Sequence, residues 1–202
     1  MPFTSFRKHF IKKFMRHMDK SHFVSSPAET LSQNILSLTM SEEFVIRKIK
    51  PEDNPAIARI IRTVMPQFGA DGDGFAIKDA EVDAMYEAYT QPRSIYFVVE
   101  HNGKVIGGGG IAPLQGGDEH TCELKKMYFL EEARGKGIGQ ELLNRCLDAA
   151  LVFGYKVCYL ETLEQMGSAR KLYEKNGFIR LTKPMGNTGH YGCNRYYAKC
   201  LQ

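Results

Sequence analysis

The segment 134–139, RGKGIG, lies between a short apolar strand pattern and a long amphipathic helix pattern. Glycine adopts positive φ angles at little steric cost, so this segment can turn sharply and bring its main chain close to a ligand. The helix that follows begins with N–H groups that have no partner inside the helix, and its dipole is positive at that end. The segment therefore predicts a main-chain cradle for an anion, and phosphate groups suit it best.

The spacing of these glycines excludes two common phosphate-binding motifs. A P-loop requires GxxxxGK followed by Ser or Thr, but Lys136 is followed by Gly137. The dinucleotide fingerprint GxGxxG requires two residues before its last glycine, and only Ile138 separates Gly137 from Gly139. Taken alone, the segment still leaves open a glycine-rich turn that binds no ligand.

Short apolar runs alternate with helical patterns along residues 44–201. The periodicities predict strands at 44–49, 95–100, 104–111, 122–129, 156–162, 178–182 and 192–201, and helices at 54–65, 78–89, 139–153 and 167–176. Asp53 is placed to cap the first helix, and Asn102-Gly103 is typical of a hairpin turn. Helices between strands indicate an α/β (α+β) fold, with helices on both faces of a mixed sheet.

Charge and hydropathy reduce the number of functional classes that fit this sequence. Residues 1–40 hold six basic and two acidic residues, which leaves 21 of each among residues 41–202 and accounts for the net charge of +4. A neutral main body does not attract nucleic acid by general electrostatics, so we expect no nucleic-acid partner. The chain has no run of about 18 apolar residues, the length that a membrane-spanning helix requires.

The cysteines indicate reduced thiols. Their number is odd, they form no CxxC pair, and their spacing matches no zinc site: Cys122, Cys146, Cys158, Cys193 and Cys200. Asp71 and Asp73 resemble the start of a calcium loop, but the further oxygen ligands of such a loop are missing. We therefore expect a cytoplasmic protein without a metal site.

The beginning of the chain differs from the rest. Residues 1–18 combine five basic residues with apolar residues at steps of three or four, which is the pattern of a basic amphipathic helix. Residues 21–40 are rich in polar residues and are typical of a linker. The sequence thus predicts an extension over residues 1–40 and a compact domain over residues 41–202. An appended helix, a membrane-surface anchor and a targeting segment all remain open for the extension.

Two motifs in this order resemble those of the GNAT (N-acetyltransferase) superfamily. RGKGIG matches the family's Arg/Gln-x-x-Gly-x-Gly/Ala loop, between a strand (ELKKMYF) and a helix. Downstream, ARKLYEKNGF at residues 169–178 matches the family's A-x-x-L-Y-x-x-x-G-F. The resemblance covers residues 44–201 and implies the GNAT fold, a mostly antiparallel sheet of about six or seven strands. Two neighbouring parallel strands of that sheet, here residues 122–129 and 156–162, splay apart.

The resemblance implies transfer of an acetyl group from acetyl-coenzyme A to a primary amine of a small molecule or a protein, by direct attack in a ternary complex. The residues that it assigns to cofactor binding are Met127, Tyr128, Phe129, Arg134, Gly135, Lys136, Gly137, Ile138, Gly139 and Arg170. One main-chain N–H, that of Met127 or Phe129, is expected to polarise the thioester oxygen. Met166 stands where many relatives carry an asparagine that contacts the cofactor, so this contact is not expected here.

The same resemblance assigns the proton transfers. Tyr173 matches the family's general acid; a phenol with a reference pKa of about 10 is protonated at neutral pH and can protonate a departing thiolate of pKa about 8.5. Glu123 is the first candidate for the general base, acting through water, and His190 is the second, with Glu161 a weaker third.

A non-catalytic acyl-coenzyme A sensor or regulatory module is the alternative function. Such a protein would keep the RGKGIG loop but would have no need of Tyr173. The acceptor amine is not identified by any motif, because the same fold supports many substrates. No sequence feature selects a partner surface, and a homodimer stays open.

Overall fold

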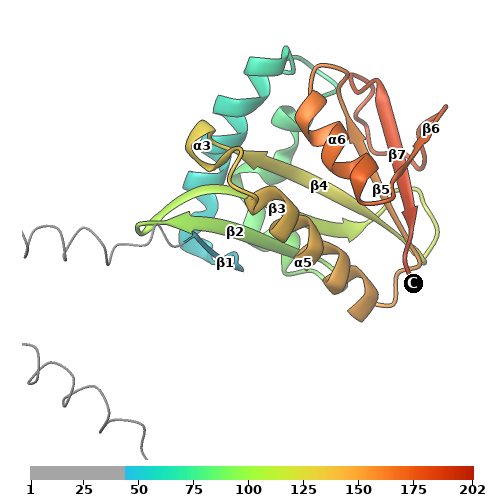
Figure 1. Cartoon of the computed structure of the whole chain (residues 1–202), viewed down its shortest axis with the longest axis horizontal. Helices are drawn as coiled ribbons and strands as arrows, with labels where there is room; N and C mark the ends of the chain where they lie inside the picture. Colours follow the sequence, from blue (N-terminus) through green and yellow to red (C-terminus); the bar gives the residue numbers. More distant parts are fainter. Residues whose placement is uncertain (1–43) are drawn as a thin grey trace, which may run out of the picture. The chain divides into compact units, whose positions relative to one another are not determined.

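The computed structural model describes residues 44–202 (Figure 1), so the predicted extension over residues 1–40 lies outside the described residues. A seven-stranded sheet has the order β1-β2-β3-β4-β5-β7-β6. Its strands are β1 Phe44–Lys48, β2 Ile95–His101, β3 Lys104–Pro113, β4 Thr121–Phe129, β5 Val157–Thr162, β6 Ile179–Leu181 and β7 Arg195–Cys200. All neighbouring pairs are antiparallel except β4 and β5. The predicted mixed, mostly antiparallel sheet is confirmed.

Helices cover both faces of this sheet. The α-helices are α3 Asn54–Val64, α4 Met85–Tyr89, α5 Ile138–Val152 and α6 Gly167–Lys175. Short 3-10 helices are η1 Pro51–Asp53, η2 Met65–Phe68, η3 Ala76–Lys78, η4 Ala80–Asp83 and η5 Glu131–Ala133. In Figure 1, α5 and α6 lie in front of the sheet, whereas α3 lies behind it. Within residues 44–202 no helix is both long and apolar enough to span a membrane.

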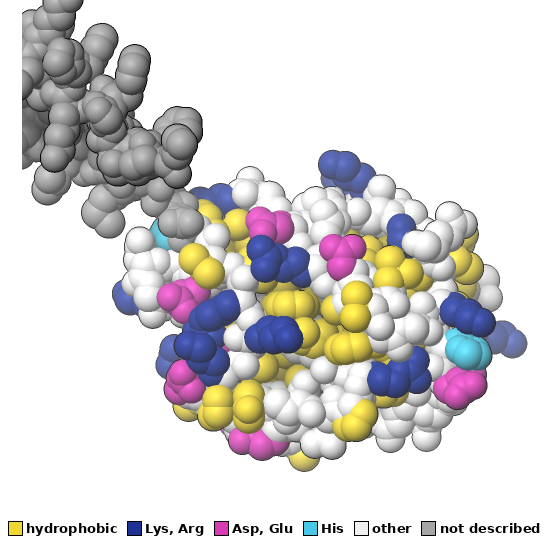
Figure 2. All heavy atoms as spheres, turned by 90° about the horizontal axis from the view of Figure 1, so that it is seen from below, with side chains coloured by type: hydrophobic (Ala, Val, Ile, Leu, Met, Phe, Trp, Pro, Cys, Tyr) yellow, Lys and Arg dark blue, Asp and Glu magenta, His cyan; other side chains and the backbone are white. Residues whose placement is uncertain are grey.

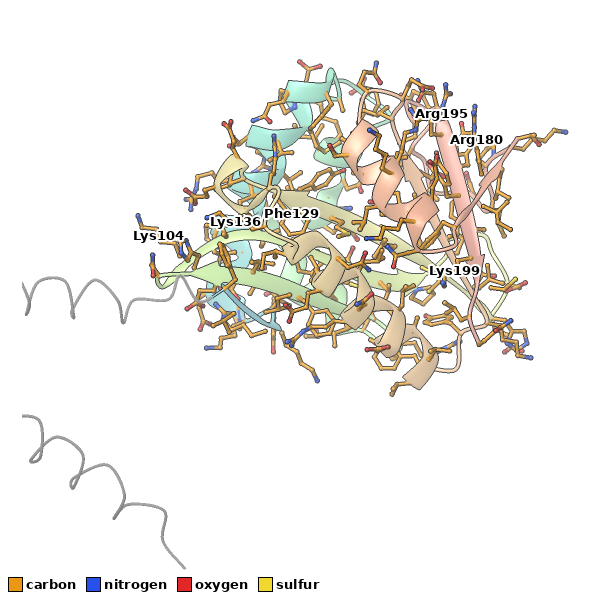
Figure 3. All side chains as sticks on the ribbon, in the orientation of Figure 1. Lys104, Phe129, Lys136, Arg180, Arg195 and Lys199 are labelled. Carbon is orange, nitrogen blue, oxygen red and sulfur yellow. The ribbon has the colours of Figure 1, made fainter. Side chains whose placement is uncertain are left out.

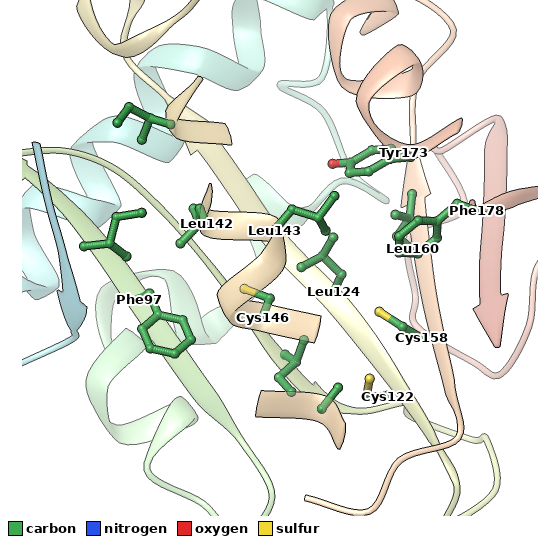
Figure 4. Packing of buried hydrophobic residues seen from close by; sticks show 14 of the residues in the cluster. Phe97, Cys122, Leu124, Leu142, Leu143, Cys146, Cys158, Leu160, Tyr173 and Phe178 are labelled. Atoms are coloured by element: carbon green, nitrogen blue, oxygen red, sulfur yellow. The ribbon is translucent and has the colours of Figure 1, made fainter. Parts of the chain in front are cut away.

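Each face has its own apolar core. On the α3 side, Ile57, Ile60, Ile61 and Val64 are almost completely buried, as their spacing predicts. On the α5 side, Leu142, Leu143 and Cys146 pack onto residues of β4 and β5 (Figure 4).

At the surface, the face shown in Figure 2 carries basic and acidic side chains around a central group of hydrophobic ones. Charges of both signs are mixed there, in keeping with a neutral main body.

The hairpin between β2 and β3 has the predicted turn. Asn102 and Gly103 have φ angles of 51° and 74°, and β2 pairs with β3 antiparallel on either side of them. Both central residues of a type I′ turn require positive φ, which asparagine and glycine tolerate best.

Two local predictions were wrong. The segment 78–89 does not form one helix; Asp79 is extended and Ala84 has a φ of −135°, so the segment divides into η4 and α4. The Asp53 side chain does not cap α3. Its carboxylate instead accepts hydrogen bonds from the Arg47 guanidinium and from the main-chain N–H of Lys50. At Asp53, hydrogen bonds to Arg47 and Lys50, close by in the sequence, thus take the place of the expected helix cap.

The parallel pair of β4 and β5 separates, as predicted. The two strands pair only from Thr121↔Val157 to Glu123↔Tyr159, although β4 continues to Phe129. Beyond this point β4 keeps its other neighbour, β3, but the register shifts by one residue between Gly108 and Gly110. Lys126, with a φ of 51°, lies in this β-bulge. The last residues of β4 therefore form an edge that faces a gap in the sheet.

Candidate active site

The gap between β4 and β5 is part of a groove of about 540 Å³, which we call the long groove. Its lining includes the end of β4, the 134–139 segment and the first turns of α6. Lining residues include Met127, Tyr128, Phe129, Arg134, Gly135, Gly137, Gly139, Met166 and Tyr173. The structure thus gathers in one groove most of the residues that the sequence assigned to cofactor binding.

The 134–139 segment presents main chain to this groove. Gly135 and Gly137 have φ angles of 74° and 80°, and α5 begins directly afterwards at Ile138. Among the described residues, no acceptor takes a hydrogen bond from the N–H groups of Gly137, Ile138 and Gly139. A Cβ added to Gly137 would meet no atom within 4 Å. The segment is therefore an open cradle of amides at a helix N-terminus, which suits a phosphate group.

Three side chains of this segment take other contacts. Arg134 donates from Nε to the main-chain oxygen of Phe129 and from Nη2 to Gln67, at the rim of the groove. The ammonium of Lys136 lies 5.0 Å from the centre of the Phe44 ring, toward β1 (Figure 3). The Ile138 side chain is buried in the core on the α5 side. The cradle is thus made by main chain, not by these side chains.

Arg170, which the sequence assigned to cofactor binding, lies outside the long groove. Its guanidinium donates to Glu164 and to the Tyr197 hydroxyl. Lys175, further along α6, does line the groove. Its ammonium can therefore contact an anion bound there.

A second cavity, of about 60 Å³, adjoins the first; we call it the small cavity. The two share five lining residues: Met127, Tyr128, Met166, Ala169 and Tyr173. The small cavity is also lined by Glu123, Glu161 and His190, from β4, β5 and the loop before β7. The structure therefore brings together Tyr173 and all three candidate bases, although 67 residues separate Glu123 from His190 along the chain.

Tyr173 lies where the two cavities meet. Its side chain is 6% exposed, and its ring contacts those of Phe178 and Tyr197 at centroid distances of 5.8 and 6.4 Å. Its hydroxyl points away from Phe178 (Figure 4). Burial raises the pKa of this phenol well above its ordinary value, so the group stays protonated across the physiological range.

Glu123 is buried and titrates near neutrality. It is 3% exposed, and burial raises the pKa of its carboxyl to about 7, against the opposing charges of Lys125 and His190. Nδ1 of His190 lies 3.9 Å from Oε1 of Glu123, too far for a hydrogen bond. Glu161 is held by the hydroxyls of Tyr159 and Thr188.

Sequence reasoning missed a charged cluster in the wall of the small cavity. The Lys126 side chain is fully buried, and its ammonium donates to the carboxylates of Asp79 and Glu81. Nε2 of His190 lies 3.0 Å from Oδ2 of Asp79. Burial opposes ionisation of Asp79, but the contacts with His190 and Lys126 lower its pKa to about 2. No pattern in the sequence pointed to this cluster, because a lysine in a regular strand is normally exposed.

The described residues contain no candidate metal centre. Within residues 44–202, no three side chains of His, Cys, Asp or Glu are grouped so that they could hold a metal ion. The polar groups that line the two cavities include main-chain amides, the carboxyls of Glu123 and Glu161, the His190 imidazole, basic side chains and the phenols of Tyr128 and Tyr173.

Known proteins share this sequence and fold. The model of the acetyltransferase (GNAT) family matches residues 57–178. The chain is 45% identical over 150 residues to the N-acetyltransferase YjgM of Escherichia coli (strain K12), which covers 74% of this chain and 90% of that protein.

Solved structures agree with this result at the level of the fold. An acetyltransferase of the GNAT family from Staphylococcus aureus Mu50 superposes with a TM-score of 0.71 at 20% identity, covering 79% of this chain and 100% of the other. The protein yncA from Salmonella typhimurium, solved with its cofactor acetyl-CoA, gives 0.63 at 24% identity over 79% and 95%. Because the family model spans more than half of the chain and YjgM is similar over most of its length, this chain belongs to the GNAT family of N-acetyltransferases.

Proposed function

We propose that this N-acetyltransferase transfers the acetyl group of acetyl-coenzyme A to a primary amine of a small molecule or peptide, within a ternary complex. One observation carries the proposal: a long groove with an amide cradle meets a small carboxylate-lined cavity at Tyr173. The groove has room for a long anionic cofactor, whereas the cavity admits only a small polar group. A panel of primary amines, assayed for release of the coenzyme A thiol, tests the proposal; no release with any amine would count against it.

The cofactor would bind mainly to main chain. The amides of Gly137, Ile138 and Gly139 would hold the pyrophosphate. The N–H of Leu130 donates to Ile106 of β3, and N–H groups alternate along a strand, so those of Met127 and Phe129 are directed away from β3. These two groups can bind the pantetheine arm and the thioester oxygen along the free edge of β4.

The acceptor would enter the small cavity as an ammonium ion. Glu123 and Glu161 both line this cavity, and neither carboxylate forms an ion pair with a lysine or arginine within the described residues. The two lysines that also line the cavity, Lys125 and Lys126, form ion pairs with Glu81 and Asp79 instead, so the charge of Glu123 and Glu161 is left to attract a cationic amine. Glu123, with a pKa of about 7, can accept the amine's proton directly or through water.

The transfer then requires one bond to form and one to break. The amine nitrogen attacks the thioester carbon, a C–N bond forms, and negative charge on the oxygen is stabilised by the N–H of Met127. When the C–S bond breaks, the departing sulfur takes a proton from the Tyr173 hydroxyl. The ammonium loses two protons in all: one replaces the proton that Tyr173 gives to sulfur, and the other passes through Glu123 to solvent.

This assignment predicts a particular pH dependence. Glu123 must be ionised to accept a proton, so kcat/KM should rise with pH and show an inflection near 7, because the pKa of Glu123 is raised to about 7. Glu123→Gln should lower kcat by about 10²-fold or more and remove this inflection. Initial rates between about pH 5.5 and 9 measure both effects, and the acceptor's own ionisation appears separately at higher pH.

Two neighbouring residues provide the controls. Glu161→Gln removes the other carboxylate of the small cavity; it should keep an inflection but move it to lower pH, because the charge of Glu161 raises the pKa of Glu123. His190→Gln should also keep an inflection but move it to higher pH, because the charge of His190 lowers the pKa of Glu123 although the imidazole lies beyond hydrogen-bonding distance. An inflection that disappears in His190→Gln but survives in Glu123→Gln would transfer the role of base to His190.

A further inference from the structure

Four consecutive glycines, residues 107–110, form the middle of β3 between β2 and β4. Glycine weakens the interior of a strand and often marks the close approach of another group. A Cβ on Gly108 would lie 2.6 Å from Cε1 of Tyr96, and a Cβ on Gly110 would lie 2.7 Å from Cδ2 of the same ring. The absence of side chains at these two positions therefore leaves room for the Tyr96 side chain against β3.

The Tyr96 side chain extends from β2 past β3 to the bulge in β4. Tyr96 is 1% exposed, and its hydroxyl donates a hydrogen bond of 2.8 Å to the main-chain oxygen of Lys126. Lys126 has a φ of 51°, an unfavourable conformation for a residue with a Cβ. Such a conformation persists only where the surrounding structure holds it, and here the hydroxyl of Tyr96 holds its carbonyl.

The side chain of Lys126 is held as well. Its ammonium lies 2.6 Å from Oδ2 of Asp79 and also contacts Glu81, and no part of the side chain is exposed. The bulge is thus fixed at two points, the carbonyl by Tyr96 and the ammonium by two carboxylates. Tyr96 itself lines neither the long groove nor the small cavity.

The carbonyl of Lys126 and the N–H of Met127 belong to one peptide group. That group is planar and trans, so its oxygen and its hydrogen point in opposite directions. A hydroxyl that fixes the oxygen therefore also fixes the direction of the Met127 N–H, on the side away from Tyr96. Donation to the oxygen also polarises the peptide, which makes its N–H a better hydrogen-bond donor.

We propose that Tyr96 is a positioning residue for acetyl transfer, which aims and polarises the Met127 N–H that binds the thioester oxygen. This inference rests on the proposed function, because it requires that N–H to act on the thioester. Gly108 and Gly110 serve the same end, since a side chain at either position would displace the tyrosine ring. Tyr96 itself contacts neither substrate.

The test compares Tyr96→Phe with Tyr89→Phe. The Tyr89 ring lies 5.0 Å from that of Tyr96, its hydroxyl is equally buried, and within the described residues that hydroxyl has no hydrogen-bond partner. Each variant loses one buried hydroxyl, but only Tyr96→Phe releases the bulge. Acetyl-coenzyme A labelled with ¹³C at the thioester carbonyl reports polarisation through its infrared band, without any acceptor.

With the unaltered chain and with Tyr89→Phe, we expect the carbonyl band of the bound thioester to move to lower frequency than in water. With Tyr96→Phe, most of this shift should be lost and kcat should fall about tenfold. This fall is smaller than the one caused by removing an oxyanion donor outright, because the Met127 N–H is still present. The dissociation constant of acetyl-coenzyme A should stay within about twofold, because the cradle at Gly137 is unchanged.

Three results would overturn the inference. A carbonyl shift retained in Tyr96→Phe would show that the hydroxyl does not act on the thioester. If Tyr96→Phe failed to fold while Tyr89→Phe folded, the Tyr96 hydroxyl would be needed for the stability of the whole fold and would not be specific to the thioester site. Absence of the shift in the unaltered chain would refute the role of the Met127 N–H itself, and the proposed mechanism of thioester activation would then fail with it.

Discussion

Replacement of Gly137 by glutamate is expected to abolish the binding of acetyl-coenzyme A. The new side chain would project from the cradle, where a Cβ meets no protein atom within 4 Å, into the space that we assign to the pyrophosphate. Its carboxylate would repel the phosphates and compete for the same amides at the start of α5. We expect the dissociation constant, measured by calorimetry, to rise by more than about 100-fold.

Gly154→Glu is the matched control. Gly154 follows the other end of α5, has a φ of 78° where Gly137 has 80°, and also offers open space to a Cβ. Both substitutions therefore impose a similar backbone strain of about 1 kcal/mol and the same added charge. Gly154→Glu should bind the cofactor normally. Equal binding by both variants would mean that the 134–139 segment does not hold the cofactor.

Local patterns predicted most of the fold because the deciding interactions are local. Every predicted strand is present, and the helices α3, α5 and α6 begin and end within about two residues of the predicted positions, inside the usual uncertainty of such boundaries. The hairpin turn at Asn102 follows from backbone preference alone. The 134–139 segment was recognisable because its glycines, its strand and its helix are consecutive in the sequence.

The details of the site depend on contacts between distant segments, which no local pattern encodes. Asp79 leaves the expected helix at 78–89 because its carboxylate binds Lys126 and His190, 47 and 111 residues away. Lys126 is buried only because the bulge in β4 turns it inward to these carboxylates. Arg170 donates to the hydroxyl of Tyr197, 27 residues away, as well as to Glu164 nearer along the chain. In each case a long-range ion pair or hydrogen bond overrides the expectation from sequence spacing.

The same distinction applies to the glycines of β3. Residues 104–111 have the pattern of an apolar strand, and the strand is present, but no local pattern explains four glycines in its middle. At Gly108 and Gly110 a Cβ would meet the ring of Tyr96 and main-chain oxygens of β2, whereas at Gly107 and Gly109 it would meet side chains of β4, those of Phe129 and Met127. A run of glycines inside a predicted strand is thus a usable signal that another side chain crosses it.

Replacement of Tyr173 by phenylalanine is expected to lower kcat by at least about tenfold, within the usual range of a general acid, and to leave the affinity for acetyl-coenzyme A nearly unchanged. The phenylalanine ring keeps the contacts with Phe178 and Tyr197, so only the proton donor is lost. Burial raises the pKa of Tyr173, so the wild-type phenol stays protonated. The fall in kcat caused by Tyr173→Phe should therefore be seen at every pH between about 6 and 9. Steady-state rates and calorimetry measure the two effects separately.

Tyr155→Phe distinguishes loss of the acid from loss of a buried hydroxyl. Tyr155 is 2% exposed, and its hydroxyl donates to the main-chain oxygen of Arg93, outside both cavities, so this variant should keep its kcat. A thiolate of pKa about 8.5 leaves more readily than an alkoxide, so the Tyr173→Phe enzyme should retain part of its rate rather than none. Unchanged turnover in Tyr173→Phe on an established acceptor would remove Tyr173 from the mechanism. Binding of acetyl-coenzyme A without turnover on any amine, in the unaltered chain, would instead favour a protein that senses the cofactor.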